Sequence, residues 1–264
     1  MSTLDFTVEL FCRVDDAMME VAKHPQAKLW PSELVTIAIL RCLKGGSERG
    51  FYRWLVANLQ ALFPRLPDRT RLLRLLATHQ EWAQRFLAEP TFFGIVDSFG
   101  IELIHPKREG RSDKQIGKKG KSNHRWIVGA KLCPLVNQYG LIVDWDYDSA
   151  NVHDNSFRPL IEEYKEQSLI LADSGFHSSQ KRGGDPENLR ICKRGEKNER
   201  MIVETVFSLM KRTLHLKQLG HRVWNYLEAR LGFLIAAYNL LAQWQGIQTD
   251  NNGRTCLSIA NFNI

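Results

Sequence analysis

The sequence predicts an α/β domain with a mixed sheet flanked by helices, preceded by an all-α segment. Up to about residue 90, apolar residues recur at helical spacing and are interrupted by Pro25, Pro31, Gly45 and Pro64. From about residue 92, short apolar runs replace that pattern, and such runs are typical of buried strands. Because these strands are mixed with helices along the chain, we expect a mixed sheet with helices packed against it.

Composition indicates a soluble protein with an anionic partner. The 264 residues are 44% hydrophobic and 25% charged, and the net charge is +7. A basic balance favours nucleic acid as the partner. The five cysteines form no Cys-x-x-Cys pair, which argues against a zinc site or a disulfide framework and fits a reducing cytosol. We find no signal peptide and no apolar stretch of membrane-spanning length, so we expect no membrane partner and a cytoplasmic location.

The helical segment contains a candidate DNA-reading helix. Asp68 is placed to cap a helix that begins at Arg69, and Arg71 and Arg74 lie in its first turns. Arginines at the start of a helix are typical of DNA recognition. A small helical bundle whose arginines are merely solvated fits the sequence equally well.

Two apolar runs in the second half end in an acidic residue. Residues 92–97 end at Asp97, and residues 169–173 end at Asp173. Further strands are predicted at 125–132, 141–145 and 189–192, with a short helix at 157–165 and a buried helix at 224–244. The chain after Gly246 is polar and is expected to fray.

A basic segment lies between the first two predicted strands. Residues 105–125 contain too few hydrophobic residues to pack, so we expect a mobile loop. Its charge density close to Asp97 favours contact with DNA over a merely solvated loop. The candidate DNA-binding residues in this segment are Lys107, Arg108, Arg111, Lys118, Lys119 and Lys121.

Residues 199–212 predict a helix with one broad apolar side. Arg200, Glu204 and Lys211 lie within about 40° of one another on the remaining side, because eleven residues make close to three turns. Taken alone, this pattern favours a solvated face with an Arg200–Glu204 ion pair. Together with Asp97 and Asp173, however, it predicts a cluster of three carboxylates.

Three clustered carboxylates need an offsetting positive charge, because they repel one another and raise each other's pKa. A pair of Mg²⁺ or Mn²⁺ ions about 3.5–4 Å apart is the usual solution, and such pairs catalyse phosphodiester chemistry. We therefore expect two divalent ions at this site, bound by Asp97, Asp173 and Glu204.

These motifs resemble those of the DDE transposases of bacterial insertion sequences. Arg200, Glu204 and Lys211 match the Arg-x3-Glu-x6-Lys signature around the third acid, with Lys197 where the family has a tyrosine. The segments Ile95-Val96-Asp97-Ser98 and Asp173-Ser174-Gly175-Phe176 resemble the first-acid and second-acid regions. The likeness extends over roughly residues 10–245.

The resemblance implies a ribonuclease-H-like catalytic domain over residues 91–246, after a helical domain at 1–90 for recognition of DNA ends or dimerisation and before a polar tail at 247–264. It also implies metal-dependent cleavage of transposon ends and strand transfer to target DNA. Asp97, Asp173 and Glu204 would be the catalytic metal ligands, and Arg200 and Lys211 would hold DNA phosphates. The protein would act as a homodimer on double-stranded DNA and associate with the nucleoid.

Alternative readings remain open at this point. Asp154 is a second choice for the middle carboxylate, and His153 is interpreted as a hydrogen-bonding loop residue. Trp126 and Trp145 are expected to pack against the protein and not to stack on a base. The chain could also be a DNA-binding protein that has lost catalysis, or a ribonuclease-H-like nuclease that cuts without joining.

Overall fold

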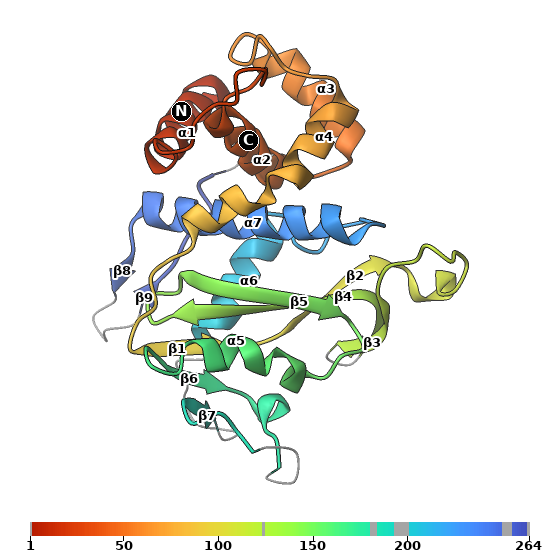
Figure 1. The fold of residues 1–264 in the computed structure, drawn as a ribbon, viewed down its shortest axis with the longest axis vertical. Coiled ribbons are helices and arrows are strands. Elements are labelled where there is room, and N and C mark those ends of the chain that lie inside the picture. Colours follow the sequence, from red (N-terminus) through yellow and green to blue (C-terminus); the bar gives the residue numbers. More distant parts are fainter. Residues whose placement is uncertain (1, 123–124, 180–183, 193–200, 250–254, 263–264) are drawn as a thin grey trace.

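The computed structural model describes residues 2–122, 125–179, 184–192, 201–249 and 255–262. Its N-terminal part is helical (Figure 1), as predicted. The elements are α1 (Thr3–Ala17), α2 (Pro31–Lys44), α3 (Glu48–Leu59), α4 (Arg69–Thr78) and the 3₁₀ segment η1 (Gln80–Phe86).

Local capping explains where these helices begin. The Ser2, Ser47 and Asp68 side chains accept hydrogen bonds from backbone N–H groups in the first turns of α1, α3 and α4. Pro31 occupies the first turn of α2, where its missing N–H costs nothing. The predicted helix start after Asp68 is therefore confirmed.

The second part contains a mixed sheet of seven strands. In chain order these are β1 (Phe93–Val96), β2 (Phe99–Ile104), β3 (Lys118–Ser122), β4 (Arg125–Asn137), β5 (Ile142–Ser149), β6 (Leu169–Ala172) and β7 (Leu189–Ile191). Strand β4 is antiparallel to β1, β2, β3 and β5, whereas β1, β6 and β7 run parallel. The core order β5-β4-β1-β6-β7 makes the fold ribonuclease-H-like, which confirms the predicted fold class.

Helices cover both faces of this sheet. Alternate strand residues contribute to two separate apolar clusters, as the period of two requires. One cluster joins Ile95 and Ile101 to α6 (Met201–Thr213) and α7 (Trp224–Gln245). The other joins Val96 and Ile170 to α5 (Arg158–Glu163). The described residues of this part also form the short 3₁₀ turns η2 (Pro106–Arg108), η3 (Asp154–Phe157) and η4 (Ser174–Phe176).

The N-terminal helices and the sheet share one hydrophobic core. Helix α7 runs between them and contacts α2, α4 and η1 (Figure 1). The cluster on the α7 face of the sheet extends without interruption to Leu10 and Leu40 in α1 and α2. The predicted domain boundary near residue 90 falls between η1 and β1, and it stays a prediction.

Asn239 fixes α7 to the sheet through hydrogen bonds. Its side chain is fully buried. The Oδ1 atom accepts from the Ile142 N–H at 2.9 Å, and Nδ2 donates to the Ile142 carbonyl at 2.7 Å and to the Phe86 carbonyl at 2.8 Å. One amide therefore satisfies backbone groups of both β5 and η1.

Two expectations about irregular segments are wrong. Within residues 105–125, the structure contains η2 and the strand β3, which pairs with β4. The segment after Gly246 contains β8 (Gln248–Thr249) and β9 (Thr255–Cys256). Beyond them Ile259 and Phe262 are buried, and the Phe262 ring lies 5.0 Å from that of Trp244, so this described part is packed and not frayed.

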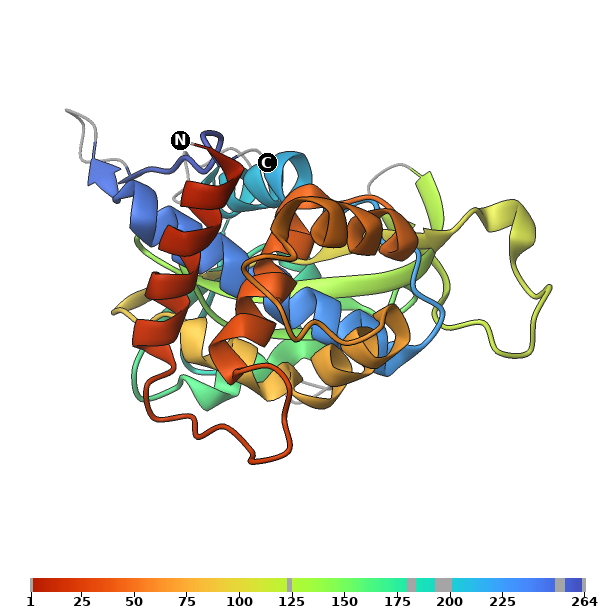
Figure 2. The ribbon, with the colours of Figure 1, turned by 90° about the horizontal axis from the view of Figure 1, so that it is seen from above.

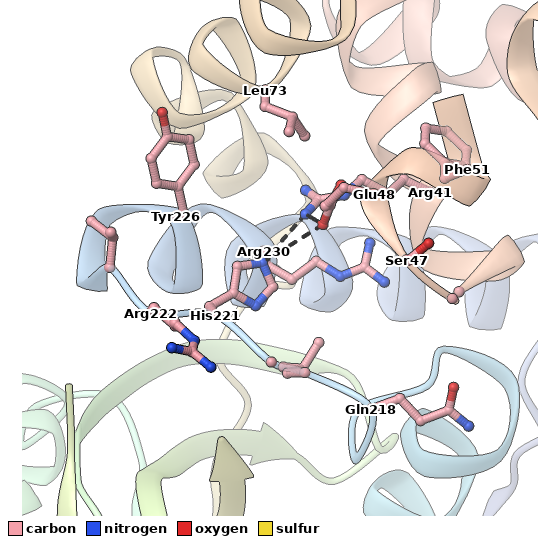
Figure 3. Close-up of a pocket in the computed structure, with 15 residues that line it drawn as sticks. Arg41, Ser47, Glu48, Phe51, Leu73, Gln218, His221, Arg222, Tyr226 and Arg230 are labelled. Atoms are coloured by element: carbon pink, nitrogen blue, oxygen red, sulfur yellow. Dashed lines mark hydrogen bonds and ion pairs between the residues drawn. The ribbon is translucent and has the colours of Figure 1, made fainter. Parts of the chain in front are cut away.

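A buried ionic network joins α2, α3 and the segment before α7 (Figure 3). The Arg41 guanidinium pairs with Glu48 and lies 3.3 Å from Nε2 of His221. Burial, and then the positive charges of Arg41 and Arg230, lower the pKa of His221 to about 4. The His221 ring is therefore neutral at pH 7.

This shift predicts that the protein loses stability in mild acid. Between the ordinary pKa of 6.5 and the folded value of about 4, the unfolded chain binds a proton that the folded chain does not, so stability falls as pH falls through that range. We expect His221→Gln to remove about 3 kcal/mol of this pH dependence, measured by urea unfolding between pH 7 and pH 4. The exposed His24→Gln is the control, and an unchanged pH dependence in His221→Gln would contradict the prediction.

No helix in the described part of the chain is long and apolar enough to cross a membrane.

Candidate active site

Asp97 and Asp173 lie at corresponding ends of two neighbouring parallel strands. Asp97 follows β1 and Asp173 follows β6. The two strands pair in parallel with Ile95 opposite Leu171, so the acids follow at the same level two residues later. Adjacent strands are about 4.8 Å apart, which brings the two acidic residues close together.

The local turns orient both carboxylates. Oδ1 of Asp97 accepts a hydrogen bond from the Ser98 N–H at 2.8 Å. Oδ1 of Asp173 accepts one from the Gly175 N–H at 2.8 Å and caps η4. Both acids therefore sit where an apolar strand turns out of the sheet.

Asp154 is a third carboxylate at this edge, and it has a positive partner. It begins η3, and its Oδ1 accepts from Ser98 Oγ at 2.5 Å and from Lys131 Nζ at 2.9 Å. A side chain on Gly175 would collide with it, because a Cβ there would lie 2.7 Å from Asp154 Oδ2 and 2.9 Å from Asp173 Oδ1. Gly175 thus separates two carboxylates that face the same point.

Asp97 and Asp154 both act on the buried thiol of Cys133. Burial, and then the negative charges of Asp154 and Asp97, hold the pKa of the Cys133 thiol well above its ordinary value. Cys133 is fully buried in β4, so it stays protonated and does not serve as a nucleophile or metal ligand.

Glu204 lies in the first turn of helix α6. Its side chain is exposed, while Val203, Val206 and Phe207 of the same helix are buried. The Phe207 ring packs 5.2 Å from the ring of Phe99, two residues after Asp97. Glu204 lies one helical turn before Phe207, and a turn rises about 5.4 Å.

Lys211 lies on the same helix, one turn beyond Phe207. Its Nζ is 5.0 Å from the centroid of the Phe99 ring. Burial, and then the neighbouring charges of Lys217 and Arg212, lower the pKa of Lys211. The helix therefore brings a cation to the start of β2, two residues after Asp97 in the chain. Arg200 and Lys197, which complete the predicted signature, lie outside the described residues.

Among the described residues, no three His, Cys, Asp or Glu side chains are arranged to hold a metal ion. Asp97 and Asp173 lie on adjacent strands, whereas Glu204 belongs to a helix packed across the sheet.

The predicted DNA-binding residues lie at the surface. The segment that follows β2 projects from the body of the protein (Figures 1 and 2), and its candidate side chains are all exposed: Lys107, Arg108, Arg111, Lys118, Lys119 and Lys121. Lys119 forms an ion pair with Glu109 at 3.6 Å. On α4, Arg71 and Arg74 are exposed and Arg69 is half-buried.

Three smaller predictions have mixed outcomes. His153 accepts a hydrogen bond from the Asn155 N–H, as expected of a loop residue. Trp145 packs against the core, as predicted. The expectation that Trp126 packs is wrong, because its side chain is 58% exposed and Lys119 Nζ lies over its ring.

Sequence reasoning missed Lys131 and the role of Ser98. Lys131 is the one charged residue inside the apolar run 127–133, and its side chain is only 12% exposed. A lone lysine within a buried strand requires an anionic partner, and that signal was present in the sequence.

One protein-family model matches this part of the chain. It is described as the transposase DDE domain, and it matches residues 91–191. Residues 91–191 are therefore similar to the transposase DDE domain, and they make up less than half of the 264-residue chain. No curated protein matches the chain significantly.

The DDE domain match covers the sheet from β1 to β7. It includes Asp97, Asp154 and Asp173, and it ends before α6 and Glu204. The match supports a transposase function in general, and with it DNA as a partner.

Proposed function

We propose that this protein is a DDE transposase that cleaves transposon-end DNA with a divalent metal and joins the freed end to target DNA. Asp97, Asp173 and Glu204 are the catalytic carboxylates. The observation that carries the proposal is the register of β1 and β6, which sets Asp97 and Asp173 at the same level of adjacent strands inside a transposase DDE domain.

The pleat of the sheet favours Asp173 over Asp154 as the second acid. Ile95 and Leu171 pack in the cluster with α6, whereas Val96 and Ala172 face α5. Because side chains alternate, Asp97 and Asp173 continue the α6 side, where Glu204 lies. Asp154 bonds instead to Ser98 and to Lys131, and Lys131 offsets its charge.

The donor chemistry of the three acids suits hard divalent cations. Carboxylate oxygens are the ligands that Mg²⁺ and Mn²⁺ prefer, and in the proposed site Asp97, Asp173 and Glu204 would hold two such ions. When bound, divalent ions activate the attacking oxygen and stabilise the departing one.

Two successive displacements at phosphorus account for the reaction. Water attacks the phosphodiester at the transposon end, a P–O bond forms, and the bond to the 3′-oxygen breaks to leave a 3′-hydroxyl. That hydroxyl then attacks a target phosphodiester and releases a new 3′-hydroxyl, so the number of phosphodiester bonds is conserved in joining. Lys211, beside Phe99, holds a phosphate next to the cut, and the basic loop holds the flanking duplex.

Cleavage of a labelled duplex that carries the element's own ends tests the proposal. With Mn²⁺, we expect Glu204→Gln to cut at least about a hundredfold more slowly than wild type and to bind the duplex equally well. The substitution keeps the size of the side chain and removes its charge.

Glu166→Gln is the matched control, since Glu166 is exposed and precedes β6, whereas Asp173 follows the opposite end of that strand. Equal cutting by wild type and Glu204→Gln would refute the catalytic role of Glu204. The polar side of α6 would then be a solvated surface with an ion pair. A strand-transfer assay with precut ends separates a transposase from a nuclease, which would cut but not join. DNA binding without any cleavage would favour a non-catalytic DNA-binding protein.

A further inference from the structure

A cavity of about 610 Å³ lies between the N-terminal helices and the segment that leads into α7 (Figure 3). Its walls come from the α2–α3 connection, from α4 and from residues 218–230. None of the three candidate catalytic acids lines it. Its size is that of a small-molecule site.

Arg230 is the feature of this cavity that requires a partner. Its side chain lines the cavity and is only 5% exposed. Among the described residues, its one hydrogen-bond acceptor is the Cys42 sulfur at 3.3 Å, and a thiol is a weak acceptor. A guanidinium carries five N–H donors, and a buried charge is normally paired. Arg230 therefore presents donors and a positive charge to the cavity.

The neighbouring charges offset Arg230 only in part, because Glu48 attracts the guanidinium while Arg41 repels it. Glu48 is the one carboxylate among the lining residues, and it already pairs with Arg41. Arg222 adds a third guanidinium to the lining. His221 is neutral, and its Nε2 faces the Arg41 donor. The lining thus has an excess of two positive charges.

The start of α3 points to the same kind of ligand. Ser47 accepts from the Gly50 N–H, and the first N–H groups of this 12-residue helix belong to residues that line or adjoin the cavity. A helix N-terminus carries a partial positive charge that favours phosphate. Leu73 and Tyr226 form an apolar wall beside these groups.

We propose that this cavity binds a nucleotide, with its phosphate against Arg230 and the start of α3 and its base against Leu73 and Tyr226. The nucleotide is either a free mononucleotide or part of a DNA strand. The site is separate from the three acids, so the proposal does not depend on the cleavage activity.

Calorimetric titration of the full chain with AMP, inorganic phosphate and adenosine tests this site. We expect saturable binding of AMP, weaker binding of phosphate, and little binding of adenosine. Arg230→Gln should weaken AMP binding by about tenfold or more, because it removes charge-assisted hydrogen bonds. Arg65→Gln removes one exposed positive charge outside the cavity and should bind AMP as wild type does.

Arg222→Gln keeps the test decisive if Arg230→Gln fails to fold. Arg222 is exposed, so its loss should leave the fold intact and weaken AMP binding by up to about fivefold. No saturable binding of AMP or phosphate by wild type would overturn the proposal. Equal affinities in Arg222→Gln and Arg65→Gln would also overturn it.

Competition identifies the source of the nucleotide. If AMP displaces a duplex from wild type, and a higher AMP concentration is needed to displace it from Arg222→Gln, the cavity holds a nucleotide of DNA. If AMP binds and duplex affinity stays unchanged, the cavity holds a free nucleotide. Both results retain the site.

Discussion

Asp97→Asn is expected to lower the rate of DNA cleavage by at least about a thousandfold. The change keeps the shape of the side chain and its hydrogen bond with the Ser98 N–H, but it removes the charge of the first carboxylate. Asp173→Asn should cause a loss of similar size, since Asp173 occupies the equivalent position on the neighbouring parallel strand. The measurement is single-turnover cutting of a labelled transposon end.

Asp154→Asn is the matched comparison for these two variants. The carboxylate of Asp154 already pairs with Lys131 and accepts a hydrogen bond from Ser98. We therefore expect Asp154 to position its neighbours, and Asp154→Asn to lower the cleavage rate less than Asp173→Asn does. If Asp154→Asn were the more severe change, the second catalytic acid would be Asp154. Cutting by Asp97→Asn at the wild-type rate would refute the proposed active site.

Asn239→Leu is expected to lower the free energy of unfolding by about 3–5 kcal/mol. The change leaves the Ile142 N–H and the Phe86 carbonyl without their amide partner, and it removes one of two hydrogen bonds to the Ile142 carbonyl, which also accepts from the Ala88 N–H. Each buried polar group left unsatisfied costs about 1–3 kcal/mol. Urea unfolding, followed by circular dichroism, measures the loss.

Asn225→Leu is the control for this variant. Asn225 lies on the same helix and is exposed, so its replacement should change stability by less than about 0.5 kcal/mol. An Asn239→Leu protein as stable as Asn225→Leu would show that the amide does not fix α7 to the sheet.

Much of the secondary structure in the sheet-containing part of the chain is predictable from the sequence, because most of its strands are short apolar runs. The positions of Asp97 and Asp173 follow from the runs that precede them, and the structure places both at strand ends. Strand β3 is not predictable in this way, because its sequence, Lys118–Ser122, is polar and exposed. Backbone pairing with β4 forms this strand, and the edges of sheets tolerate lysines.

Contacts between distant segments are the part of the structure that cannot be read from the pattern of residues along the sequence. The bond between Lys131 and Asp154 joins β4 to η3, and hydrophobic periodicity carries no information about such a pair. The burial of Phe262 likewise depends on Phe6 and Trp244 at other points of the chain. The position of Glu204 relative to Asp97 and Asp173 likewise depends on how α6 packs on the sheet, and the function of Glu204 stays a prediction.

The core shared by the N-terminal helices, α7 and the sheet would set the distance between the place where DNA is bound and the place where it is cut. Helices with a common core do not reorient independently, so the span from the arginines of α4 to the acids at the ends of β1 and β6 is constant. A duplex gripped by those arginines would then be cut at a set number of base pairs from the sequence they contact. Base pairs inserted between the two places would move the cut relative to the element's end by the same number.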